Sequence, residues 1–234
     1  MDEKLKKLIT KNKKSLVDWT NAINNHIENK NRDINTKEAI EDVYKLVEVF
    51  SDITDIIISY GRYKDEFEYE KFSLGYHGPE LIINAIKTKS TFYIGLDYEG
   101  IYLTTHLRNN FNIRNMDDKF WIDLLSLYNY GNFELEQTEG FDSNFKKEFP
   151  EIFNIKKSII FNIFRKFFVD TILEKDNYRK YDKVGDFGVF KVCWDETFAL
   201  DKIIDELTAV FKIMYSLNYK LWKIEDLQNN KIKN

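Results

Sequence analysis

The clearest pattern of hydrophobic and polar positions lies in the stretch Ser90–Arg108. Bulky and small residues alternate over Phe92–Leu96 and again over Ile101–Leu107. A period of two is typical of β-strands, and Glu99-Gly100 between the two runs supplies a turn. The stretch therefore predicts a β-hairpin. Because an isolated hairpin is only marginally stable in water, we expect it at the centre of a sheet that helices cover.

Apolar residues recur at helical spacing in several other parts of the chain. The predicted long helices cover residues 2–30, a segment from Asn35 or Thr36 to Gly61, residues 118–130, residues 149–173 and residues 197–221. A shorter helix is predicted over Glu80–Ile86, because Pro79 would occupy its first position, where the missing N–H is not needed. These amphipathic segments supply the layer that would cover the sheet.

Three further short segments alternate like strands, at residues 66–72, 132–138 and 186–194. Together with the hairpin they give about five strands, which are not regularly interleaved with helices. This order predicts the α+β class, with a mainly antiparallel sheet packed against several long amphipathic helices. We expect residues 1–60 to form an N-terminal helical hairpin and residues 61–234 a mixed α+β core, the two parts making one compact unit.

Composition narrows the class of protein. The chain has 234 residues, of which 43% are hydrophobic and 16% aromatic, so it can build a sizeable core. Its single cysteine excludes an internal disulfide and a cysteine-based zinc site. No apolar run reaches the roughly 20 residues of a membrane span. We therefore expect a cytoplasmic protein without membrane contact, and the abundant Lys, Asn and Ile suggest a bacterial or phage genome rich in A and T.

Sequence motifs of the common enzyme classes are missing. The chain has no glycine-rich phosphate loop, no Gly-x-Ser-x-Gly elbow and no His-Glu-x-x-His helix. Asp186-Phe187-Gly188 spells the magnesium tripeptide of kinases, but no His-Arg-Asp precedes it. We therefore expect neither a cofactor nor a metal ion. If the protein is an enzyme, His77 in a glycine-flanked turn or His106 near the end of the hairpin is the candidate polar site.

A metal-dependent nuclease is a further alternative, because such enzymes need clustered acids and usually a lysine. The candidate residues are Glu68, Glu70, Lys71, Asp97 and Glu99. Their spacing does not match an acid on one strand followed by acid-x-Lys on the next. The sequence thus gives this hypothesis little support.

The leading hypothesis is a non-enzymatic protein-binding protein, acting as an inhibitor or immunity-type partner that occludes its target. The chain is acidic, with a net charge of −4, rich in aromatic residues and poor in motifs. Aromatic and arginine side chains often anchor protein interfaces. The candidate anchors are Tyr69 and Tyr98, with Arg108 beside the hairpin.

Nucleic acid is the alternative partner. The segments TFYIGLDYEGIYLTT, at Thr91–Thr105, and Asp186–Asn218 resemble the N-terminal DNA-reading domain of McrB-type restriction proteins. The resemblance covers about a fifth of the chain. It implies a module of a restriction or defence system that receives a flipped base in an aromatic pocket. Phosphate contacts would then come from four cationic residues, Arg62, Lys64, Arg108 and Arg114.

Overall fold

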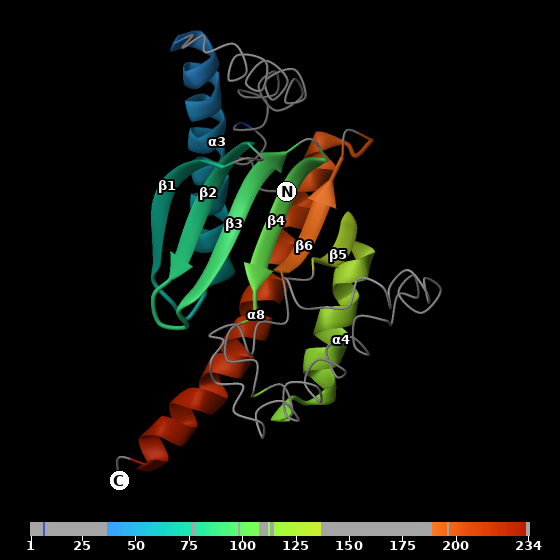
Figure 1. The fold of residues 1–234 in the computed structure, drawn as a ribbon. Helices are drawn as coiled ribbons and strands as arrows, with labels where there is room; N and C mark the ends of the chain where they lie inside the picture. Colours follow the sequence, from blue (N-terminus) through green and yellow to red (C-terminus); the bar gives the residue numbers. More distant parts are fainter. Residues whose placement is uncertain are drawn as a thin grey trace, which may run out of the picture.

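The protein is an α+β structure built on one antiparallel sheet of six strands, seen in a computed structural model (Figure 1). The structure describes Lys7, residues 37–75, 78–97, 99–107, Asn112, and residues 115–136, 189–195 and 197–232. The strands are β1 (Phe67–Gly75), β2 (Gly78–Ala85), β3 (Ser90–Asp97), β4 (Gly100–His106), β5 (Asn132–Glu136) and β6 (Val189–Trp194). The helices are α3 (Lys37–Gly61), α4 (Asp118–Ser126), the 3₁₀ turn Leu127–Asn129 and α8 (Leu200–Ile232).

The predicted hairpin is confirmed and lies in the middle of the sheet. Strands β3 and β4 pair antiparallel, and Asp97 opposite Gly100 closes the turn. The strand order is β1-β2-β3-β4-β6-β5, so β2 and β6 flank the hairpin. The last strand in the chain is thus inserted between β4 and β5, and Ile101 is paired with Trp194.

The prediction of a short helix at Glu80–Ile86 is wrong. This segment belongs to β2, where buried and partly exposed residues alternate from Leu81 to Ala85. A proline is tolerated here because the pairing of β2 with β3 begins at Glu80, one residue beyond Pro79. The period of two therefore outweighs the helix-start signal of the proline.

Two long helices cover one face of the sheet. Figure 1 shows α3 behind β1 and β2, and α8 crossing behind the other strands. The core lies between these helices and alternate strand residues, because successive side chains of a strand point to opposite faces. Its largest fully buried side chains are Trp194, Phe50, Phe92, Phe120, Phe190 and Phe211. Two further long helices predicted at residues 2–30 and 149–173 lie outside the described residues.

The ends of the helices follow from local sequence. Helix α3 ends at Gly61, as predicted, and the residue in left-handed conformation is Arg62, with φ 48°. A Cβ at Gly61 would lie 2.0 Å from the ring of Tyr63, so a larger residue there would displace this ring. Helix α4 begins after Asp117, whose carboxylate accepts a hydrogen bond from the Phe120 N–H. Helix α8 is longer than predicted, because neither glycine nor proline interrupts it after Leu221.

Helices that could cross a membrane are missing from the described part of the chain, since none combines the required length and apolar content. The proposed division at residue 60 stays a prediction.

Candidate functional site: a basic end and a buried polar cluster

The predicted site residues do not converge on one place. Arg62 and Lys64 lie together, exposed, in the connection between α3 and β1. Tyr69 is half-buried, and its hydroxyl donates a hydrogen bond of 2.7 Å to the Asp55 carboxylate of α3. His106 is half-buried in β4. The remaining candidates lie outside the described residues; these are Tyr98, Arg108, Arg114 and His77.

Asp65 joins the α3–β1 connection to the β2–β3 turn. Its carboxylate accepts hydrogen bonds from the N–H groups of Lys87, at 2.7 Å, and Thr88, at 3.1 Å. The Thr88 hydroxyl donates a third bond of 2.9 Å, and the Ile86 N–H donates to the Glu66 carbonyl at 2.9 Å. Two segments that are distant in the sequence are thereby held side by side.

These two segments carry four exposed cations, Arg62, Lys64, Lys87 and Lys89. None of the four makes an ion pair within the described ranges. The Lys87 ammonium lies 4.9 Å from the ring centroid of Trp222, in α8. Residues of both segments line an open cleft of about 470 Å³: Lys64, Asp65, Glu66, Ile86 and Lys87. We call this surface the basic end.

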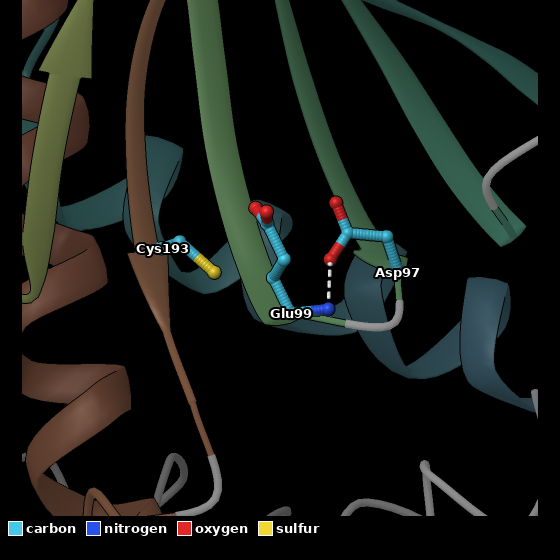
Figure 2. A group of neighbouring side chains, drawn as sticks. All are labelled: Asp97, Glu99 and Cys193. Carbon is cyan, nitrogen blue, oxygen red and sulfur yellow. Dashed lines mark hydrogen bonds between the residues drawn. The ribbon is translucent and has the colours of Figure 1, made fainter.

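A second polar group lies at the other end of β3, around the β3–β4 turn. The Asp97 carboxylate accepts hydrogen bonds from the N–H groups of Glu99, at 2.8 Å, and Gly100, at 3.1 Å. The Lys191 ammonium, from β6, lies 3.2 Å from Asp97 Oδ2 and 2.6 Å from Glu99 Oε2. Cys193 follows Lys191 on the same face of β6. Figure 2 shows its sulfur directed toward the Glu99 carboxylate. We call Asp97, Glu99, Lys191 and Cys193 the polar cluster.

The polar cluster is largely buried, although it lies on the sheet face opposite α3 and α8. Asp97 and Lys191 are each only 6% exposed. The Lys191 ammonium also lies 5.5 Å from the ring centroid of Tyr102, which stabilises a cation. The Tyr102 ring extends across Gly95, and its hydroxyl donates a 2.7 Å hydrogen bond to Glu80. A buried cation is thus surrounded by two carboxylates and an aromatic ring.

The environment of Cys193 disfavours ionisation of its thiol. Burial and the neighbouring carboxylates, Asp97 first among them, raise the pKa of Cys193 to about 12. A thiol with such a pKa is protonated at neutral pH and is a poor nucleophile. Such a thiol can pack inside strand β6 without reacting.

The cluster brings together acids and a lysine in a way that the sequence did not reveal. Asp97 and Glu99 were candidates for a metal-dependent nuclease, but the lysine that meets them is Lys191 and not Lys71. Spacing could not find Lys191, because it lies in a strand from the far end of the chain. The sequence did contain a signal, because Lys191 is the one charged residue in the otherwise apolar strand VFKVCW.

The buried protonated groups predict alkaline unfolding. Burial raises the pKa values of Tyr63, Tyr69 and Tyr215 above 10.0, and that of Cys193 from 9.0 to about 12. A group whose pKa is raised by folding contributes its full stabilisation at pH values below its pKa in the unfolded chain. This contribution is lost as the pH rises toward its pKa in the folded protein. We therefore expect the free energy of unfolding to fall progressively above about pH 9. Urea titrations at a series of pH values measure it.

The matched control is Cys193→Ala, which removes one of these ionisations. Its free energy of unfolding should fall less steeply than that of the wild type between about pH 9 and about pH 12. A wild-type stability that stays constant over this range would contradict the burial of the four groups.

Comparisons with family models, with curated proteins and with solved structures give no match for this chain.

Proposed function

We propose that this protein acts by binding, and that its basic end contacts an acidic surface of a partner protein. The observation that carries the proposal is the set of four exposed cations without ion pairs in the described part of the chain. These cations gather where Asp65 holds two segments together, so the surface is ordered before binding.

Apolar and acidic groups in the same place favour protein over nucleic acid. Ile86 in the cleft is 45% exposed, and the partly exposed ring of Trp222 lies beside Lys87. Aromatic and aliphatic side chains surrounded by charges are common at the centre of protein interfaces. Glu66 lines the cleft as well, so this surface carries both signs of charge, which suits separate carboxylates on a protein better than a continuous phosphate backbone.

The proposed consequence for the partner is occlusion, as in inhibitors and immunity-type proteins. Complementary charges would steer the encounter, and burial of the apolar centre would slow dissociation. The sequence assigned Arg62 and Lys64 to phosphate contacts, and in this proposal they contact carboxylates of a protein instead. Tyr69 is better suited to a structural role, because its hydroxyl is already bonded to Asp55.

The test is affinity capture from a lysate of the source cells with the wild type and with the double variant Arg62→Glu/Lys64→Glu. We expect the wild type to retain a stoichiometric protein after nuclease treatment. The double variant should bind that protein at least roughly tenfold more weakly, which corresponds to about 1.4 kcal/mol.

A control variant carries the same change of net charge elsewhere, at Lys119→Glu/Lys212→Glu. Both lysines are exposed, Lys119 on α4 and Lys212 on α8, about 15 Å along the helix from Trp222. This control should bind as the wild type does. Equal binding by all three proteins would refute the basic end as the contact. Recovery of nucleic acid that is lost at high salt would replace the protein partner with a nucleic acid.

A further inference from the structure

The polar cluster contains three groups that could ligate one metal ion. Asp97 and Glu99 each offer a carboxylate oxygen and Cys193 offers its sulfur, and these atoms lie within 4.8 Å of one another. They come from two strand regions that are almost a hundred residues apart in the sequence, and β4–β6 pairing places them together. Figure 2 shows the three side chains near one another, with Lys191, whose ammonium contacts both carboxylates, left out of the drawing.

The two carboxylates have a partner in Lys191, but the thiol has none. Cys193 is 4% exposed and donates or accepts no hydrogen bond in the described part of the chain. Its sulfur lies within 4.8 Å of a carboxylate oxygen of Asp97 and of Glu99. A cation between the three groups would give all of them one function, since thiolate and carboxylate are both zinc ligands.

We propose that Asp97, Glu99 and Cys193 form a binding site for a thiophilic divalent cation of the zinc class. Lys191 is then the cation of the metal-free state, because its ammonium bridges the two carboxylates at 3.2 Å and 2.6 Å. Two carboxylates and one ammonium leave a net charge of −1 in a largely buried place. This residual charge attracts a second positive charge.

The donor set decides which cation fits. Magnesium and calcium prefer oxygen ligands alone, whereas zinc, cobalt and cadmium accept a thiolate beside carboxylates. Ligand atoms of a tetrahedral site lie roughly 3.5 Å apart. The three side chains would therefore have to move inward by small rotations as the metal replaces the ammonium. The Glu99 side chain is 43% exposed and gives the ion a way in from solvent.

Charge and atoms balance when the metal ion replaces the thiol proton and displaces the Lys191 ammonium. The metal ion bonds to Cys193 Sγ, and the thiol proton passes to the buffer, so one proton is released for each ion bound. Lys191 keeps its proton and moves away from the carboxylates as an ammonium ion. The reaction involves no electron transfer and needs no co-reactant. Binding should consequently strengthen as pH rises.

The experiment is a titration of the full chain with cobalt(II) at about pH 8, followed by ultraviolet absorption. A thiolate bound to cobalt gives a charge-transfer band in the near ultraviolet, which carboxylates alone do not give. We expect this band in the wild type with one cobalt per chain, and its complete loss in Cys193→Ser. Glu99→Gln should bind at least roughly tenfold more weakly.

Two further variants make the test selective. Glu68→Gln removes an exposed carboxylate on β1 and should leave cobalt binding unchanged. Lys191→Met removes the competing ammonium and should bind cobalt more tightly than the wild type, provided that its circular dichroism spectrum shows a folded protein. If it does not fold alone, cobalt should restore the native spectrum.

Three results would overturn the proposal. They are a wild type without the band, a band that persists in Cys193→Ser, and a folded Lys191→Met variant with no gain in affinity. Because the cluster lies at the opposite end of β3 from the basic end, none of these results depends on partner binding.

Discussion

Phe211→Ala should lower the free energy of unfolding by roughly 3–5 kcal/mol, the range for truncating a buried aromatic residue. Phe211 is fully buried in α8, and its ring centroid lies 4.9 Å from that of Phe92 in β3. It also lies 5.5 Å from the ring of Tyr63 and 6.0 Å from that of Phe67. The truncation would remove contacts from the sheet, the α3–β1 connection and α8 at once. Urea denaturation followed by circular dichroism measures the loss.

The control is Ile122→Ala, which truncates an apolar residue that is 65% exposed on α4. Its free energy of unfolding should stay within about 0.5 kcal/mol of the wild type. A loss below about 1 kcal/mol for Phe211→Ala would contradict the packing of α8 on the sheet.

Gly100→Ala is expected to cost roughly 2–3 kcal/mol, because two effects act together. The φ of Gly100 is +137°, a backbone conformation that residues with a side chain rarely adopt. A Cβ at this position would also lie 2.2 Å from the carbonyl oxygen of Trp194. This neighbour belongs to the paired strand β6 and cannot move without disturbing the ladder between β4 and β6. Thermal and urea unfolding both report the change.

Gly95→Ala provides the comparison. Its added Cβ would meet the distal atoms of the Tyr102 side chain and not a backbone atom. Since a side chain can rotate away, the loss of stability should be smaller than for Gly100→Ala. Equal stability of the wild type and Gly100→Ala would contradict the geometry of the turn.

Local patterns predicted most of the described elements because those elements depend on neighbouring residues. The alternation of apolar residues located β1, β3, β4, β5 and β6, and the helical stripe located α3 and α8. In α8 the predicted core positions Ile203, Leu207, Phe211 and Met214 are all buried. The exception is β2, where the consecutive apolar residues Leu81, Ile82 and Ile83 hide the alternation beside Pro79.

The candidate sites were less predictable because they depend on pairing between distant segments. Arg62 and Lys64 were recognised as exposed cations, but Lys87 joins them only through the hydrogen bonds of Asp65. Lys191 meets Asp97 only because β6 pairs with β4. Nothing in the spacing of residues along the chain specifies such a strand order. The expectation that no metal ion binds stays a prediction, and the metal site proposed above is assembled across strands, where no sequence motif could indicate it.

The insertion of β6 between β4 and β5 has a consequence for synthesis on the ribosome. Each of β1, β2 and β3 pairs with the next strand in the chain, so this part of the sheet can form as soon as it emerges. Strand β5 emerges next, yet its neighbour in the sheet is the much later β6. In a nascent chain that stops before Val189, one edge of β4 would be unpaired and β5 would have no strand to pair with. Translation of β6, Val189–Trp194, therefore completes the sheet and covers the aggregation-prone edge of β4.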